Sequence, residues 1–568
     1  MMKKYKLTAA FLLIAFASLS WSFREDLFQV SKNLDIFAAL YKEVSVNYVE
    51  ETSPSDLMRT GIDAMLDGLD PYTEYVPESE IEDYKLKYVS TQYGGIGAST
   101  LFIEGKLFVN EVSEGYPADK QGIKPGDQIV KINGNEVKGK ERNQISQLLR
   151  GPKSSEVELL VIRDGAVITK KLTRDEIKQP NVSYSGMTAD QFAYIRLDKF
   201  LENSAQEVKD AATTLSKQQP KGMILDLRYN GGGILQEAVK IVNLFVGKDI
   251  TVVTQKGKNP QKTITYKTYN EPILPQMPLV VLVGGSSASA SEIVAGALQD
   301  LDRGIIVGQR SYGKGLVQQT FNLPYNSLVK VTVAKYFTPS GRCIQALDYA
   351  HKDAEGKTLK FADSLATKFN TKAGRNVYDG NGIYPDVVVA ATKPSPVTVS
   401  IVSKNLFFDY ANDFKKRNKS ISGPESFQLS DAEYNLFVAA MAGKDYSYTS
   451  RTERLLSDLR TEAERENKLP AVKADLDDLR SKMLGAKKTD LINYKSEIKR
   501  VLETQIISRY YYDKGKVLQA FQYDKELAAA KAVLGNGPKM LAILKGEGEY
   551  KTIGNPAKIV TAAAALEN

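Results

Sequence analysis

Two kinds of hydrophobic spacing divide the first third of the chain. From about residue 24 to 88, apolar side chains such as Leu34, Phe37 and Leu40 recur every three or four residues, which predicts helices. From about residue 90 to 175, short apolar runs end at turn dipeptides such as Asn133-Gly134. This second pattern predicts a small β-rich domain with one or two helices.

The rest of the chain changes from alternating strands and helices to charged helices. An apolar helical face from Ile234 to Phe245 separates two of the strand-like runs, and beyond about residue 398 the sequence predicts charged helices that carry no motif. The predicted buried strands are Phe192–Leu197, Met223–Leu227, Leu279–Val283, Ile305–Val307 and Leu328–Ala334. Such alternation between about 180 and 395 is typical of an α/β layer fold.

Length and composition fit several globular domains and exclude some functions. The 568 residues suggest three or four domains, and the net charge of +8 is spread along the chain. Because no concentrated basic face is evident, we expect no nucleic-acid partner. With one cysteine, Cys343, and one histidine, His351, the chain can build neither an internal disulfide nor a Cys/His zinc site, and we expect no metal or other cofactor.

The first 22 residues have the pattern of an export signal. Lys3, Lys4 and Lys6 precede an apolar run from Leu7 to about Leu19, and small residues follow before Phe23. This pattern predicts a signal peptide over residues 1–22 and a location in the periplasm or cell envelope. The alternative is an uncleaved membrane anchor, although the run is short for a spanning helix.

A serine-rich elbow follows the strand Leu279–Val283. The run from Gly284 to Glu292 reads GGSSASASE, and an amphipathic helix begins near Ser289. The first N–H groups of a helix lack partners, so they can bind a developing oxyanion; the N–H of Ala290 is the natural donor. The alternative is that the serines only cap the helix.

A lysine between two glycines, Lys314, is the candidate base for such a serine. A buried lysine can lose its proton near neutral pH, and Gln318, four residues on, is placed to orient the amine. The alternative for Lys314 is a solvated loop lysine. If His351, in a polar stretch, were the base, the mechanism would be of the Ser–His type.

A second glycine-rich turn, from Asn230 to Gly233, follows the strand Met223–Leu227. Its backbone N–H groups are candidates for a second oxyanion donor. The alternatives are a plain tight turn or a phosphate loop, but the spacing fits neither nucleotide-binding motif.

Taken together, these segments resemble the carboxyl-terminal processing (tail-specific) protease family of serine peptidases over about residues 30–390. The resemblance rests on these segments in order: 69–73 (LDPYT), 93–98 (YGGIGA), 122–127 (GIKPGD), 226–233 (DLRYNGGG), 287–292 (SASASE), 313–318 (GKGLVQ), 338–342 (TPSGR) and 382–386 (GIYPD).

The resemblance implies a role for each site residue. It places the nucleophile on Ser289, the base on Lys314 and the lysine-orienting residue on Gln318. It implies oxyanion donors from the N–H groups of Ala290 and Gly232. The substrate's C-terminal carboxylate would bind the backbone of the loop formed by Gly94, Gly95, Ile96 and Gly97, with the tail added as a strand.

The resemblance also implies an α/β multidomain architecture. It comprises an N-terminal helical segment (23–88), an inserted PDZ domain (89–176), a crotonase-like catalytic core (177–396) and an α-helical C-terminal extension (397–568). Two departures from the family lie in the core. Asn230 precedes three glycines where many members have Pro-Gly-Gly, and a polar insertion occupies about Ala346–Arg375.

The sequence thus predicts a serine endopeptidase that cuts exported proteins near their C-termini and recognises free C-terminal tails. One alternative is a non-catalytic PDZ scaffold that binds such tails. Another is a crotonase-like acyl-CoA enzyme, against which the export signal and the PDZ-like segment argue. The extension is a candidate platform, homo-oligomer contact or adaptor site.

Overall fold

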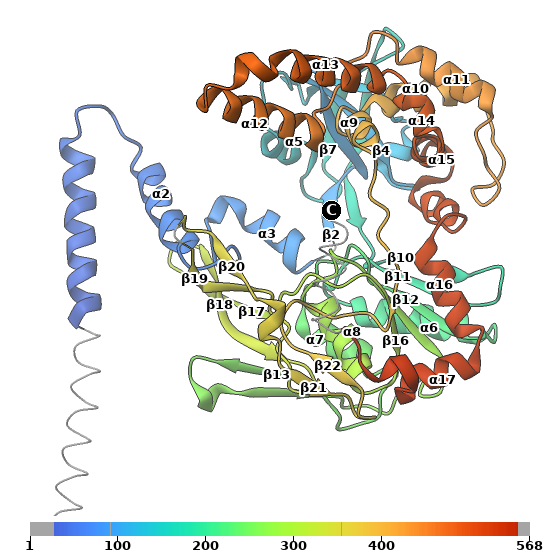
Figure 1. Cartoon of the computed structure of the whole chain (residues 1–568). Coiled ribbons are helices and arrows are strands. Elements are labelled where there is room, and N and C mark those ends of the chain that lie inside the picture. Colours follow the sequence, from blue (N-terminus) through green and yellow to red (C-terminus); the bar gives the residue numbers. More distant parts are fainter. Residues whose placement is uncertain (1–27, 91, 354, 555–568) are drawn as a thin grey trace, which may run out of the picture. The chain divides into compact units, whose positions relative to one another are not determined.

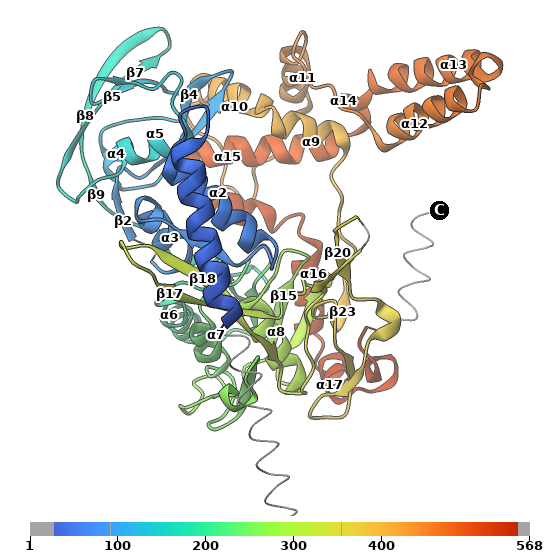
Figure 2. The same ribbon diagram turned by 90° about the vertical axis from the view of Figure 1, so that its left-hand side faces the viewer.

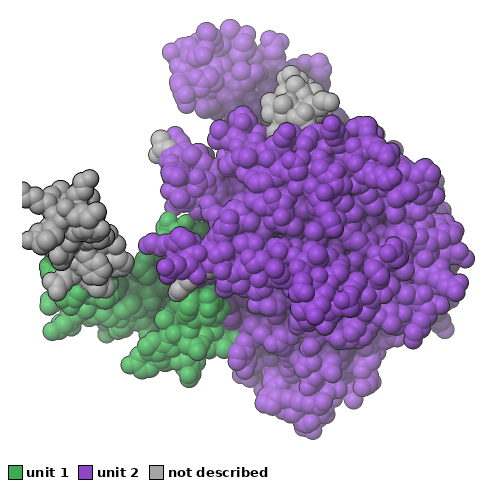
Figure 3. Space-filling model, turned by 90° about the horizontal axis from the view of Figure 1, so that it is seen from below, with its two compact units in different colours: residues 1–81, 318–332 green, residues 82–317, 333–568 purple. Residues whose placement is uncertain are grey.

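The computed structural model describes residues 28–90, 92–353 and 355–554. The described chain falls into two compact units, coloured separately in Figure 3 and drawn as ribbons in Figures 1 and 2. Unit 1 runs to Ile81 and includes Gln318–Thr332; unit 2 comprises the remaining residues. The predicted signal peptide, residues 1–22, lies outside the described residues. No helix in the described part is both long and apolar enough to cross a membrane.

Unit 1 is largely helical. A helix spans residues 28–47, and Pro54 starts the next helix behind the cap Ser53. The remaining bounds are α2 (Pro54–Asp67), β1 (Glu74–Val76), η1 (Glu78–Glu80), most of β17 (Leu316–Asn322) and the first half of β18 (Leu328–Phe337). In the turn before β1, Asp70 Oδ1 accepts the N–H groups of Tyr72 and Thr73 at 2.8 and 2.9 Å. This side-chain turn explains the motif at residues 69–73.

Unit 2 begins with a β-domain of residues 92–178, which follows α3 (Ile81–Tyr88). Its main sheet has the order β3-β4-β5-β7-β8, with β6 on β5, while β2 pairs with β9. The bounds are β2 (Gln92–Gly95), β3 (Ala98–Ile103), β4 (Lys106–Val112), α4 (Pro117–Lys120), β5 (Gln128–Ile132), β6 (Asn135–Glu136), α5 (Arg142–Leu149), β7 (Glu156–Arg163), β8 (Ala166–Thr173) and β9 (Asp175–Lys178). Because β3 is an edge strand, it can accept a further strand.

The predicted catalytic core contains a six-stranded sheet of order β10-β11-β12-β15-β16-β23. All neighbouring strands from β11 to β23 run parallel, and β10 is antiparallel at one edge. The bounds are β10 (Val182–Met187), β11 (Ala193–Leu197), β12 (Met223–Asp226), β15 (Leu279–Val283), β16 (Ile305–Gly308) and β23 (Val387–Val388). Four of the five predicted buried strands form this sheet. The fifth lies in β18, whose burial alternates as in a strand with one buried face.

Helices cover both faces of this sheet. Leu279, Val281 and Val283 pack against α6 (Ser204–Ser216), α7 (Leu235–Val242) and α8 (Ala290–Asp300). Val280 and Leu282, on the other face, pack against α16 (Lys525–Leu534) and α17 (Gly537–Lys545), drawn in red in Figure 1. This double cover explains the unbroken apolar run of β15. It also packs the last helices of the predicted extension against the sheet of the predicted catalytic core.

The other strands of unit 2 form two small hairpins and part of a larger antiparallel sheet. β13 pairs with β14 and with the second half of β18, β19 with β20, and β21 with β22. Their bounds are β13 (Thr251–Gly257), η2 (Pro260–Lys262), β14 (Ile264–Lys267), β19 (Leu347–Lys352), β20 (Thr358–Lys360), η3 (Asp363–Leu365), β21 (Lys368–Asn370) and β22 (Asn376–Tyr378). The polar insertion therefore has regular β-structure.

A helical domain follows from Pro396. Its core joins side chains of the neighbouring helices, including Phe407, Phe437 and Ile506. The bounds are α9 (Pro396–Ser403), α10 (Leu406–Arg417), α11 (Asp431–Ala440), α12 (Arg451–Arg465), α13 (Leu469–Lys487), α14 (Asp490–Asn493), α15 (Lys495–Ala520) and, after α17, η4 (Gly548–Lys551). α15 kinks at Tyr512, where φ is 54° and ψ is −155°. It supplies Ile506 to the helical core and, beyond the kink, Val517 to the core of the catalytic sheet.

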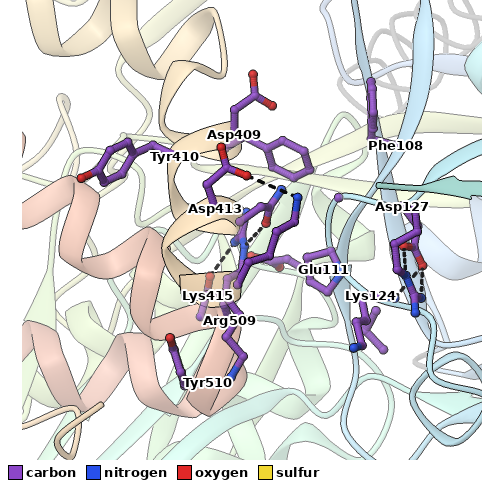
Figure 4. A pocket seen from close by; sticks show the side chains of 18 of the residues that line it. Phe108, Glu111, Lys124, Asp127, Asp409, Tyr410, Asp413, Lys415, Arg509 and Tyr510 are labelled. Atoms are coloured by element: carbon purple, nitrogen blue, oxygen red, sulfur yellow. Dashed lines mark hydrogen bonds and ion pairs between the residues drawn. The ribbon is translucent and has the colours of Figure 1, made fainter. Parts of the chain in front are cut away.

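A cavity of about 1000 Å³ lies between the β-domain and the helical domain (Figure 4). Charged side chains at its wall are largely paired, as in the ion pair of Arg163 with Asp127 at 2.6 Å. Lys415 stacks over the ring of Tyr510, 3.4 Å from its centroid. None of the predicted catalytic or tail-binding residues lines this cavity.

Candidate active site

Ser289 stands at the elbow between β15 and α8, immediately before the first helical residue. Its backbone has φ 55° and ψ −113°, a conformation that residues with a side chain rarely adopt. Such strain is retained only where the surrounding structure fixes it. The elbow therefore holds the serine in one defined orientation at the carboxyl end of a parallel strand.

The N–H of Ala290 is free to donate at this elbow. The neighbouring N–H groups of Ser291 and Glu292 bond to Ala288 and Ser289 carbonyls at 3.1 and 2.8 Å. Ala290 N–H has no acceptor among the described residues. Ala290 is fully buried, so an unpaired donor there is costly unless a ligand satisfies it. The structure places this predicted oxyanion donor next to Ser289.

The glycine turn after β12 packs directly against the elbow. A Cβ on Gly232, whose φ is +96°, would lie 2.8 Å from both Ser289 Cβ and Ala290 N, so only glycine fits. The carbonyl of Asn230 accepts the N–H of Ala288 at 3.1 Å and the hydroxyl of Ser291 at 2.8 Å. These contacts join the turn and the elbow in one structure.

The predicted second oxyanion donor, the N–H of Gly232, has a hydrogen-bond partner within its own turn. Its N–H donates to the side-chain oxygen Oδ1 of Asn230 at 2.9 Å. Asparagine commonly accepts the N–H two residues further along, and here that local bond occupies the donor. In the described conformation Gly232 lines the elbow but does not present a free N–H.

Glu292 connects the elbow to the lysine loop. Its carboxylate is fully buried, and Oε2 accepts the backbone N–H of Ser289 at 2.8 Å and that of Lys314 at 2.9 Å. Oε1 accepts the Ser311 hydroxyl at 2.5 Å and the Gly313 N–H at 2.7 Å. Burial raises the pKa of Glu292, while the four hydrogen bonds oppose that shift.

Lys314 lies in an extended loop before β17, and its side chain is half-buried. The flanking glycines permit a close approach of the chain that follows β18. A Cβ on Gly313 would lie 2.5 Å from Ala346 Cβ, and one on Gly315 would lie 2.9 Å from Gln345 N. The Gly-Lys-Gly sequence is therefore a steric requirement of this loop.

Gln318 lies on β17, in unit 1. Its side-chain amide donates from Nε2 to the hydroxyl of Thr332 on β18 at 3.1 Å. Its role in orienting the lysine stays a prediction. His351 is exposed on β19 and pairs with Asp348 at 2.7 Å, an ordinary surface contact.

The predicted tail-binding loop has the backbone geometry expected of a carboxylate site. Gly94 and Gly95 belong to β2, and the carbonyls of Ile96 and Gly97 accept the N–H groups of Ala118 and Ser113 at 2.8 Å. The N–H groups of Ile96 and Gly97 have no acceptor in the described part of the chain. Two adjacent unpaired donors beside the edge strand β3 can bind a terminal carboxylate.

Two residues that join segments around the candidate site had no predicted role, Glu292 and Arg228. Glu292 follows Ser289 by three positions, and this Ser-x-x-Glu spacing is the signature of a helix capping box, which would have identified the bond between them. Its hydrogen bonds to the loop of Lys314 could not be predicted from the sequence around Glu292. Arg228, in the motif before the glycine turn, contacts Asp524, almost 300 positions later, so its partner was not predictable from spacing.

Three parts of the chain match known families. Residues 191–351 match Peptidase family S41, and residues 108–163 match a PDZ domain. Residues 397–534 match the domain described as a probable PDZ-protease, C-terminal helical domain. The first two matches lie within the predicted catalytic core and the β-domain, and the third covers the helical domain together with α16.

Curated relatives are similar over about half of this chain. The carboxy-terminal processing protease CtpA of Bacillus subtilis (strain 168) is 35% identical over 306 residues, which cover 54% of this chain and 65% of that protein. A probable CtpA-like serine protease of Staphylococcus aureus (strain bovine RF122 / ET3-1) is 35% identical over 316 residues, 55% and 62% of the two chains. The chain thus spans less than two thirds of the length of each relative.

Two solved structures are also similar. The photosystem II D1 C-terminal processing protease is 30% identical, with 61% of this chain and 85% of that chain covered and a TM-score of 0.33. The PDZ domain of a carboxy-terminal protease from Vibrio cholerae, solved in complex with a peptide, is 27% identical, with 16% and 99% covered and a TM-score of 0.15.

Proposed function

Because the chain belongs to peptidase family S41, we propose that it is a serine endopeptidase that cleaves exported proteins near their C-termini. One observation carries the proposal. Ser289 is held in a strained elbow beside the unpaired N–H of Ala290. The buried carboxylate of Glu292 accepts the backbone N–H of Ser289 and also that of Lys314.

In the proposed reaction, Ser289 Oγ attacks the scissile carbonyl while Lys314 Nζ takes its proton. The carbonyl oxygen, on which negative charge develops, accepts a hydrogen bond from the N–H of Ala290. Collapse of the tetrahedral intermediate expels the amine, which takes the proton from Lys314, and leaves an acyl-enzyme on Ser289. Water, deprotonated by the same lysine, then hydrolyses the ester. Gln318 is assigned to orient the lysine.

The β-domain would select the substrate. We assign the free N–H groups of Ile96 and Gly97 to the terminal carboxylate of the tail, which would lie along the edge strand β3. An amidated tail lacks the carboxylate, so we expect it to bind much more weakly than the same peptide with a free C-terminus. Equal affinity of the two peptides would argue against this assignment.

Three further assignments belong to the proposal. The export-like pattern of residues 1–22 supports a location in the periplasm or cell envelope. The parallel sheet with helices on both faces supports a crotonase-like core. The helical domain, which none of the predicted catalytic residues belongs to, is a candidate contact for a second copy or an adaptor.

The deciding experiment measures cleavage of an unfolded protein with an apolar C-terminal tail. We expect turnover by the wild type and none by Ser289→Ala or Lys314→Ala, with all three proteins folded. His351→Ala removes the one histidine of the chain and should leave turnover unchanged. Loss of turnover in His351→Ala would favour a Ser–His mechanism, and tail binding without turnover in the wild type would favour a scaffold.

A further inference from the structure

We propose that Arg228 is a positioning residue through which the C-terminal helix α16 holds the glycine turn beside Ser289. The inference deepens the proposed function and rests on it. It assigns the last helices of the chain a part in catalysis, in addition to their cover of the sheet.

Arg228 lies between the carboxylates of two distant segments. It donates to Asp226 at the end of β12 at 2.7 Å, and its two terminal nitrogens donate to Asp524 at 2.9 and 2.6 Å. Glu526, in the first turn of α16, lies 3.4 Å from the same guanidinium. Only 13% of the Arg228 side chain is exposed, so these ion pairs are poorly screened by water.

The charges around Arg228 require a guanidinium. Three carboxylates face one cation, and the rigid fork of arginine can bond two of them in pairs. Burial lowers the pKa of Arg228, but Asp226 and Asp524 outweigh that effect and hold its pKa above the ordinary value. Asp524 also accepts the N–H of Leu527 at 2.8 Å and so caps α16.

Arg228, which these ion pairs hold, immediately precedes the glycine turn in the sequence. Arg228 is followed by Tyr229, whose φ of 63° starts the turn, and then by Asn230. Asn230 accepts the N–H of Ala288 and holds the N–H of Gly232. A shift of the Arg228 backbone would therefore move the glycine turn and its contact with the elbow that carries the N–H of Ala290.

The start of α16 also contacts the loop after β16, which lies beside the loop after β15. Glu526 Oε1 accepts the side-chain amide of Gln309, just after β16, at 2.7 Å. A Cβ on Gly284, the first residue after β15, would lie 3.3 Å from Gln309 Oε1 and 3.9 Å from Arg228 Cγ. The start of α16 thus contacts groups at the carboxyl ends of β12 and β16, and these groups flank the end of β15 between them, where α/β proteins place their active sites.

Packing of α16 does not depend on these charges. Leu527, Ala530 and Val533 bury its apolar face against the sheet. Lys531 makes a separate ion pair with Asp190, far along the chain from the turn. Mutation can therefore remove the ion pairs of Arg228 and leave the apolar packing of α16 on the sheet intact. Lys531→Gln is the matched control.

The test compares the double variant Asp524→Asn/Glu526→Gln with Lys531→Gln and the wild type in the full chain. We measure kcat and KM for the unfolded tail-bearing protein, affinity for a free-carboxylate tail peptide, and affinity for a peptidyl boronic acid. The boronic acid forms a tetrahedral adduct on the serine, so its affinity reports the oxyanion donors, which a merely structural role would not move.

We expect kcat and boronic-acid affinity of the double variant to fall together by roughly tenfold or more, with KM and tail-peptide affinity unchanged. Lys531→Gln should match the wild type. Unchanged kcat and boronic-acid affinity in the double variant would overturn the proposal, as would an equal loss in Lys531→Gln. If the double variant does not fold, Asp524→Asn alone serves, because asparagine caps helices as well as aspartate does.

The two proposals fail in distinguishable ways. A wild type without turnover would count against the serine protease itself and would remove both proposals. A wild type with turnover, together with a double variant of unchanged kcat, would count against the role of Arg228 alone.

Discussion

Ser289 and Lys314 donate their backbone N–H groups to the same oxygen atom, Oε2 of Glu292, at 2.8 and 2.9 Å. The candidate nucleophile and the candidate base are thus fixed to each other through one buried carboxylate. Their side chains carry the proposed chemistry, while Glu292 determines where their backbones stand.

Replacing Glu292 by glutamine should impair catalysis. The amide has one acceptor oxygen, so its NH₂ group would face two of the four donors that the carboxylate now accepts. We expect kcat to fall by roughly tenfold or more and the free energy of unfolding to fall by about 1–3 kcal/mol. Steady-state kinetics and urea denaturation measure the two effects.

Glu503→Gln is the matched control for that variant. Glu503 is also buried with a raised pKa and lies in the helical domain, but one of its oxygens has no hydrogen-bond partner among the described residues. We expect kcat of this variant to equal that of the wild type. An equal loss of kcat in both variants would mean that Glu292 acts through general stability and not through the elbow.

The pH dependence of stability should report the burial of Glu292. Its pKa is raised above the ordinary value of 4.5, so the folded protein binds more protons than the unfolded chain above that pH. Stability from this group is therefore full at low pH and is lost as pH rises through the folded pKa. Urea denaturation between pH 4 and 7 should show the wild type losing stability relative to Glu292→Gln as pH rises. A constant or increasing difference would contradict the assignment.

Gly97→Ala should abolish tail binding. A Cβ there would lie 2.3 Å from Tyr116 Cβ, which must displace the loop that carries the free N–H groups. Gly105 has the same φ of +73°, and apart from its chain neighbours no atom of the described residues lies within 4 Å of its Cβ position, so Gly105→Ala carries only the backbone strain of about 1–2 kcal/mol. Fluorescence anisotropy with a free-carboxylate peptide, in a Ser289→Ala background, measures both. Retained binding by Gly97→Ala would refute the assignment of the loop.

Arg342→Met should destabilise the core strongly. Arg342 and Asp300 form a 2.7 Å ion pair in which both side chains are 0% exposed. Removing one partner leaves a buried charge, which costs about 3–5 kcal/mol. Arg465→Met breaks an exposed pair with Glu462 and should cost less than about 1 kcal/mol. Thermal denaturation distinguishes the two, and a small effect of Arg342→Met would show that water or another group replaces the partner.

Local sequence patterns predicted the strands of the catalytic sheet, but they did not predict which helices pack on that sheet. The five consecutive apolar residues of β15 indicate a strand covered on both faces, and the structure confirms this. Which helix covers the second face was not predictable, because the apolar side of α16 looks like that of any amphipathic helix. Leu527 meets the sheet only through tertiary packing.

In the candidate site too, local patterns predicted close backbone approaches but not the hydrogen-bond partners. The glycines around Ser289 and Lys314 mark close backbone approaches, which the structure contains at Gly232 and Gly313. Whether a given N–H is free depends on competing acceptors, and the side chain of Asn230 takes the one on Gly232. An asparagine two residues before a glycine donor is a local warning of such competition.

The double cover of the catalytic sheet has a consequence for the newborn protein. Ser289 and Lys314 are synthesised well before Val517, Leu527 and Ile543, which bury the second face of their sheet. A growing chain can fold its β-domain early, but one side of the catalytic sheet stays bare until α16 and α17 emerge. In the proposed protease, activity would therefore have to wait until the C-terminal helices have been synthesised.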